Sequence, residues 1–226
     1  MIGPDALARL CGWLYLVASL FWIVGSALRD RTFGAEPGAF SVDNLRTSPV
    51  LARIGLIVDL AAVVGFLVTA IALYVLLVNV NQLAAGLMVV FVAIGVPVGL
   101  FALASEHAAL TLATGPSAVS AAGAGSADAS AALLIDLQSA ARTMHELIAG
   151  LWLLPLAYLV VASGSFPRAV GVLLLVAGAS WLVHLGLVVL TPQLTRLASF
   201  VVLGAIGEIV FMLWLIVRGV EIPPAG

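Results

Sequence analysis

Long apolar runs separated by short polar segments dominate this chain. A helix needs about 20 apolar residues to cross a hydrocarbon core of about 30 Å. Six runs reach that length, at residues 10–28, 53–78, 83–104, 143–163, 169–190 and 197–217. The pattern predicts an all-α fold, a six-helix transmembrane bundle that forms one integral-membrane domain over residues 1–226.

The predicted connections are of two kinds. Residues 79–82, 163–168 and 191–196 are short enough to be hairpin turns, which place consecutive helices side by side. Residues 29–52 and 108–131 are longer. The first is polar and contains Gly and Pro, whereas the second contains GPSAVSAAGAGSADAS, a composition that predicts a flexible linker.

Composition places the chain in a lipid bilayer. Hydrophobic residues make up 63% of the chain and charged residues 9%, against about 25% charged residues in soluble domains. The mean hydropathy is +1.24. We therefore expect a multi-pass integral protein of a cell membrane. The formal net charge of −2 and the lack of a basic block exclude a nucleic-acid partner. The single cysteine, Cys11, can form neither an intramolecular disulfide nor a cysteine-based zinc site.

Three ionisable residues lie deep within the apolar runs: Asp59, His184 and Glu208. Each costs roughly 2.5–3.5 kcal/mol to insert, so such residues usually face other helices or a water-filled cavity. Around Asp59, three-and-four spacing makes a stripe of mostly small residues that lets helices approach closely. It consists of Ala52, Gly55, Asp59, Ala62, Phe66 and Thr69.

These residues predict a polar centre built from the second, fourth, fifth and sixth runs. Arg142 and Glu146 are four residues apart and can pair on one helix. A buried carboxyl group is a candidate proton donor, so the candidate catalytic residues are Glu208, Asp59 and His184. Residues of the same segments supply candidate substrate contacts, namely Trp181, Trp152, Phe211, Met212, Arg53, His145 and Glu146.

A metal site is not predicted, and neither is a cofactor. His145-Glu146-Leu147-Ile148-Ala149 begins like the zinc-protease motif HExxH, but Ala149 stands where the second histidine is needed. The three histidines and the carboxylates show no other ligand spacing.

Three stretches together resemble a known bacterial membrane family, the domain of unknown function numbered 4386. They are LYVLLVNVNQLAAGLMVVF at 73–91, LPLAYLVVASGSFPRAVGVLLLVAGASWLVHL at 154–185 and GEIVFMLWLIVRGV at 207–220. Ala157 departs from the family pattern, which often has Gly before the tyrosine. The resemblance implies a six-span membrane protein with Arg53, Arg168 and Glu208 at recurrent positions. It implies no established activity.

Three functions fit these residues. The first is binding of, or acid–base chemistry on, a hydrophobic small molecule or lipid; protonation like that of small membrane terpene cyclases is one form of it, by analogy only. The second is a structural or accessory subunit whose buried polar residues only pack helices. The third is a proton-coupled transporter, for which six spans would call for a homo-oligomer.

Overall fold

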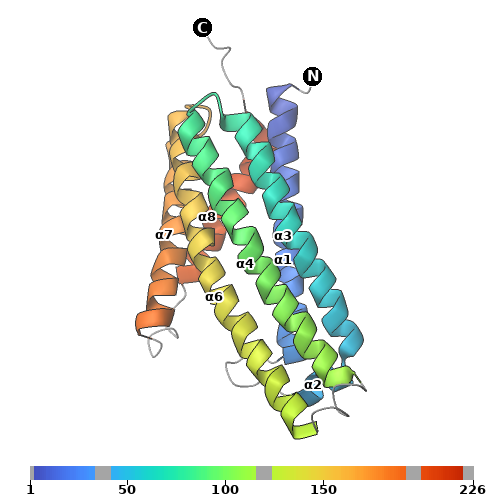
Figure 1. Cartoon of the computed structure of the whole chain (residues 1–226). Coiled ribbons are helices and arrows are strands. Elements are labelled where there is room, and N and C mark those ends of the chain that lie inside the picture. The colour runs from blue at the N-terminus through green and yellow to red at the C-terminus, as the bar shows by residue number, and fades with distance from the viewer. Residues whose placement is uncertain (1–2, 34–41, 116–123, 192–199, 221–226) are drawn as a thin grey trace. The chain divides into compact units, whose positions relative to one another are not determined.

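A computed structural model describes residues 3–33, 42–115, 124–191 and 200–220. Within these ranges the chain is helical and contains no strand, which confirms the all-α prediction. Figure 1 shows the helices, and their bounds are α1 Pro4–Phe33, α2 Val42–Thr47, α3 Pro49–Leu77, α4 Gln82–Thr114, α6 Ala124–Ala162, α7 Arg168–Leu190 and α8 Phe200–Arg218.

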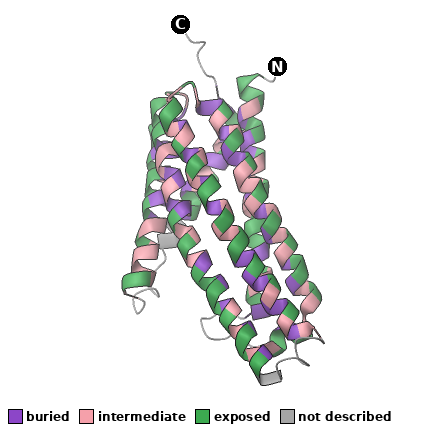
Figure 2. Cartoon of the chain, viewed as in Figure 1, coloured by how far each residue is buried: buried purple, intermediate pink, exposed green. Residues whose placement is uncertain are grey.

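Five of these helices are long and apolar enough to cross a membrane: α1, α3, α4, α6 from Ser126 onward, and α7. Much of their length is exposed, as the green parts of the ribbon in Figure 2 show. The exposed large apolar residues include Ile57 and Leu83. Exposure on this scale suits a lipid environment. Helix α8 has 19 residues, of which the side chains are described from Gly204 onward. The sixth span therefore stays a prediction.

The predicted linker at 108–131 begins and ends in helix. Helix α4 continues to Thr114 and α6 begins at Ala124, while residues 116–123 lie outside the described part of the chain. The correction has a physical reason. Alanine is the strongest helix former, and Ala113 and Ala131 are buried in one core cluster together with Ile135. An Ala/Ser-rich composition was read as flexible, although its buried alanines favour packed helix.

The polar connection at 29–52 is also shorter than predicted. Helix α1 extends to Phe33, and α3 begins at Pro49, where proline suits the first helical position. Between them the short helix α2 buries Leu45 completely.

Two predicted turns are confirmed in position. Asn81 Oδ1 accepts the backbone N–H of Ala84 at 3.0 Å and so caps the start of α4. Between α6 and α7, Gly164 has a φ of +66°, a conformation that glycine adopts without a Cβ penalty. The third turn, at 191–196, lies almost wholly outside the described residues.

The helices divide between two compact units. The Glu208 unit consists of Met1–Val17, Gly65–Val96 and Thr143–Gly226, and the Asp59 unit consists of Ala18–Val64 and Pro97–Arg142. Helices α1, α3, α4 and α6 each contribute one segment to each unit. Whether the chain forms a single domain stays a prediction.

Each unit has its own apolar core. In the Glu208 unit, Tyr15, Leu153 and Phe211 belong to one large cluster, and α7 packs beside α8. A Cβ added at Gly178 would lie 2.9 Å from the Gly150 carbonyl oxygen, so α6 and α7 approach closely there. In the Asp59 unit, a smaller cluster contains Leu45 and Leu110.

Candidate functional site

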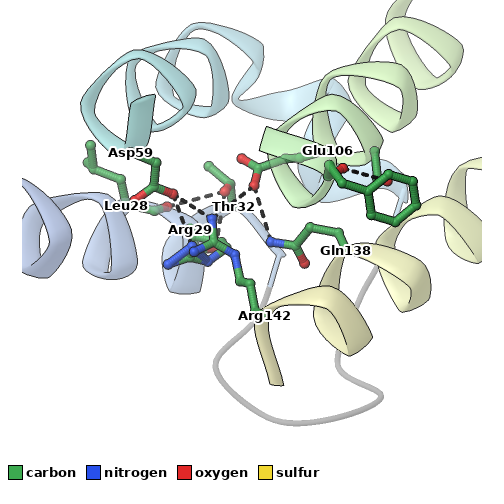
Figure 3. A network of polar contacts seen from close by, with 9 residues as sticks. Leu28, Arg29, Thr32, Asp59, Glu106, Gln138 and Arg142 are labelled. Atoms are coloured by element: carbon green, nitrogen blue, oxygen red, sulfur yellow. Dashed lines mark hydrogen bonds and ion pairs between the residues drawn. The ribbon is translucent and has the colours of Figure 1, made fainter. Parts of the chain in front are cut away.

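Asp59 is held by two arginines from other helices. Its side chain is 4% exposed, and its Oδ2 atom accepts hydrogen bonds from Arg29 Nη1 of α1 at 3.0 Å and Arg142 Nη2 of α6 at 2.6 Å (Figure 3). The stripe predicted around Asp59 is confirmed, because Ala52, Gly55, Ala62 and Thr69 are buried and Phe66 is partly buried.

A second carboxylate joins this network. Glu106 of α4 is 1% exposed, and its Oε2 atom accepts Gln138 Nε2 at 3.2 Å and lies 3.6 Å from Arg142 Nη2. Nearby, Thr32 Oγ1 donates to the carbonyl oxygens of Leu28 and Arg29. The network thus places two carboxyl groups beside two guanidinium groups. Buried charges are tolerated when they are paired and hydrogen-bonded in this way.

Close helix packing sets the position of Asp59. A Cβ atom added at Gly25 would lie 2.0 Å from Asp59 Oδ1. The carboxylate therefore rests against the backbone of α1, a position that only glycine leaves open. The other oxygen, Oδ2, is thereby turned toward the two arginines.

Glu208 has neutral partners. Its Oε2 atom accepts the hydroxyl of Tyr15 from α1 in a close hydrogen bond, and its Oε1 atom accepts Trp181 Nε1 from α7 at 3.3 Å. Tyr15 is fully buried, and its ring makes edge contacts with Phe66 at 5.8 Å and Trp152 at 5.5 Å between centroids. No cation pairs with Glu208 within the described residues.

His184 forms a second polar pair in the Glu208 unit. Its Nδ1 atom lies 2.6 Å from Glu146 Oε2 of α6, and both side chains are about one-fifth exposed. When Glu146 is ionised, Nδ1 is the donor and Nε2 becomes the acceptor nitrogen of the ring. His184 and Trp181 are three residues apart on α7, so they share one face of that helix.

The other predicted contact residues fall into two groups. Trp152, Phe211 and Met212 are buried in the core of the Glu208 unit, and His145 is half-buried in α6. Arg53, by contrast, is exposed at the start of α3.

The predicted pair of Arg142 with Glu146 is wrong. Arg142 binds Asp59 and lies near Glu106, whereas Glu146 binds His184. Four-residue spacing permits a pair on one helix, but each side chain finds a partner on another helix. Glu106, which follows the apolar run at 83–104, is buried within α4.

Sequence reasoning missed Tyr15, Arg29 and Gln138. Tyr15 lies in an aromatic-rich run where no local pattern singles out one hydroxyl. Arg29 follows the apolar run of α1 and was assigned to a loop, although it lies one helical turn after Gly25. That spacing is the one signal that could have placed it on the interior face.

Arg46 forms an electrostatic clasp, a set of surface hydrogen bonds that joins α2 to α4 and α6 in the Asp59 unit. Arg46 of α2 donates to Asp128 of α6 at 2.5 Å, to Asp43 at 3.2 Å and to the Ala113 carbonyl oxygen of α4 at 3.1 Å. The hydrogen bond with Asp128 is the main cause that raises the pKa of Arg46 above its ordinary value. The guanidinium therefore stays charged and joins α2 to α4 and α6.

The fold and these polar groups define an all-helical protein of membrane character that carries charged side chains inside its spans. The family model described as domain of unknown function (DUF4386) matches residues 10–219. The chain belongs to this family, as the resemblance of its three characteristic stretches indicated. Comparison with curated proteins and with solved structures finds no match.

Proposed function

We propose that the protein binds a hydrophobic small molecule or lipid in the Glu208 unit and acts on it by acid–base chemistry. Glu208 is the proton donor, and His184, oriented by Glu146, is the proton acceptor. Buried aromatic side chains, Trp152 and Phe211 among them, supply apolar surface, and aromatic faces can stabilise a cationic intermediate.

One observation carries this proposal. A single face of α7 presents Trp181, which binds Glu208, and one turn later His184, which binds Glu146. Residues three apart on a helix have Cβ atoms about 5–6 Å from each other. One face of α7 therefore binds the proposed acid through Trp181 and carries the proposed base, His184, one turn later. An acid whose partners are neutral donors can hold its proton without leaving a buried cation unpaired.

In this proposal α8 is the sixth span. Its support is a contact within the Glu208 unit, where Arg9 Nη1 near the start of α1 lies 3.4 Å from the Ile216 carbonyl oxygen near the end of α8. An even number of spans places the two ends of the chain on one side of the membrane, which agrees with that contact. A location in the bacterial cell membrane and assembly into a homo-oligomer belong to the same proposal.

A structural role is the second candidate, and it concerns the Asp59 unit. There the predicted catalytic residue Asp59 is bound by two arginines, and Glu106 lies beside one of them. Such a network joins α1, α3, α4 and α6 and favours helix packing over proton transfer. In our proposal Asp59 is therefore a counter-ion.

The test compares lipid and metabolite profiles of membranes that contain the wild-type chain or Glu208→Gln, by mass spectrometry. Membranes that contain the wild-type chain should differ from membranes without the protein in the amount of its product. We expect Glu208→Gln and His184→Gln each to abolish this difference. Asp136→Asn, at an exposed position of α6, is the matched control and should keep it. A well-folded Glu208→Gln protein with the wild-type profile would contradict the proposal.

A further inference from the structure

The two oxygens of Glu208 are bound unequally. Oε2 accepts the Tyr15 hydroxyl in a close contact, whereas Oε1 lies 3.3 Å from Trp181 Nε1. The usual N–H···O distance is about 2.9–3.0 Å, so the bond to Oε1 is the weaker one. Tyr15 comes from α1 and Trp181 from α7, and the two donors approach the carboxyl group from different helices.

This inequality decides which oxygen carries the proton of the neutral acid. A protonated carboxyl group has one O–H donor, and its other oxygen keeps its full accepting capacity. The oxygen with the stronger donor is the better acceptor, which here is Oε2. The proton then resides on Oε1, beside Trp181.

We infer that Tyr15 is a positioning residue that keeps the transferable proton of Glu208 on Oε1, the oxygen that Trp181 and α7 approach. The inference rests on the proposed role of Glu208 as an acid. Tyr15 suits the task because its ring is fully buried and its edge contacts with Phe66 and Trp152 fix its orientation. Tyr15 itself does not touch the ligand.

The proton balance is simple. The Oε1–H bond breaks as the electron pair of a double bond on the ligand takes the proton to form a C–H bond, and the O–H electron pair stays on Glu208 as carboxylate. The Tyr15 hydroxyl and the Trp181 N–H then donate to the two oxygens of that carboxylate, so no side chain has to move. The protonated ligand returns to neutrality when it gives a proton to His184 Nε2. A proton passing from His184 to Glu208 restores the starting state.

The substrate class follows from this arrangement. A ligand that receives a proton on one atom and loses one from a neighbouring atom isomerises or cyclises with no net oxidation, and the apolar side chains of the Glu208 unit favour an alkene or a related apolar molecule. A single proton donor and a single acceptor suffice for that reaction, and no co-reactant is needed.

Infrared spectroscopy of the full chain in detergent tests the position of the proton without a ligand. A carbonyl group that accepts a hydrogen bond absorbs at lower wavenumber. Glu208→Gln should remove one protonated-carboxyl band, and Tyr15→Phe should move that band to higher wavenumber. Trp181→Phe should move it less. Tyr158→Phe, at an exposed position, is the matched control and should leave it unchanged.

Labelling with 3-fluorotyrosine covers the case in which Tyr15→Phe does not fold. Tyr74→Phe and Tyr158→Phe restrict the label to Tyr15, because the chain has three tyrosines. The fluorinated hydroxyl is a stronger donor, so the Glu208 band should move to lower wavenumber. A spectrum in which Glu208→Gln removes no band overturns the inference. A larger shift with Trp181→Phe than with Tyr15→Phe also overturns it, and so does a band that the label does not move.

The two proposals fail separately. If the band behaves as expected but Glu208→Gln leaves the membrane profile unchanged, the proposed function is wrong and the positioning of the proton stands. If Glu208→Gln changes the membrane profile but Tyr15→Phe does not move the Glu208 band, the function stands and the inference is wrong.

Discussion

The two units hold the carboxyl groups inside their helices in opposite ways. In the Asp59 unit, the Asp59 carboxylate accepts hydrogen bonds from two arginines, and Glu106 lies near one of them. In the Glu208 unit, Glu208 accepts a tyrosine hydroxyl and an indole N–H, both neutral. The residue types are nearly the same, and so is their placement inside apolar helices. The difference lies in the charge of the partner.

This difference separates a structural use of an acid from a chemical one. Removing the charge of Asp59 leaves two partly buried arginines without their counter-ion, which costs stability. Glu208 can gain or lose a proton while keeping both hydrogen bonds. We therefore expect stability to depend on the first group and chemistry on the second, and four substitutions test this contrast.

Asp59→Asn should have the largest effect on stability. It leaves Arg29 and Arg142 without the carboxylate that both contact, and breaking a buried ion pair costs about 3–5 kcal/mol. Thermal unfolding in detergent measures the loss, with Asp136→Asn as the exposed control. A loss within about 1 kcal/mol, the usual range of exposed pairs, would break the comparison, because the network would then not be structural.

Gly25→Ala should have the next largest effect. The new methyl group would lie 2.0 Å from Asp59 Oδ1 and would push the carboxylate away from its arginines. Overpacking of this kind costs about 1–3 kcal/mol. Gly86→Ala is the matched control, because nothing lies within 4 Å of its added Cβ; there, helix propensity predicts a gain of up to about 1 kcal/mol. Equal melting temperatures for the two variants would contradict the packing of Asp59 against α1.

Glu208→Gln should change stability little and chemistry strongly. The amide keeps the shape of the side chain and leaves no cation behind, so we expect a loss of about 1 kcal/mol, that of one hydrogen bond. The same preparation should lose the wild-type lipid or metabolite profile. A destabilisation as large as that of Asp59→Asn, with an unchanged profile, would assign both acids to helix packing.

Arg46→Gln should have the smallest effect, because its ion pairs are exposed. Because the pKa of Arg46 is raised, its contribution to stability is fully present below the ordinary arginine pKa and is lost only as the pH rises through the raised value. The melting temperature of the Arg46→Gln variant should therefore differ from that of the wild type by the same amount at neutral and mildly alkaline pH. The difference should be smaller in high salt. A difference that grows with salt would contradict an electrostatic clasp.

Much of the fold could be predicted because the bilayer imposes a simple rule. The apolar runs place the five confirmed candidate spans, and the small residues around Asp59 predict a buried face that the structure confirms. Helix ends were predicted less well. The stretch at 108–131 is polar enough to be read as a linker, but its alanines pack in a core.

The site could be predicted only in part. Asp59, His184 and Glu208 stand out because ionisable groups in apolar runs are costly. Their partners do not stand out, since Tyr15 is 193 residues away from Glu208 and Arg142 is 83 residues away from Asp59. Local spacing even suggests the wrong pair, Arg142 with Glu146.

The sequence by itself determined which residues lie in helices of membrane length and which acids are out of place there. Both properties depend on the local balance between apolar and charged residues, which consecutive residues of one segment determine. Only the tertiary structure decided that Asp59 faces arginines while Glu208 faces neutral donors. The physical reason is that an electrostatic partner is chosen by proximity in space, and helices brought together by packing carry residues from distant parts of the chain.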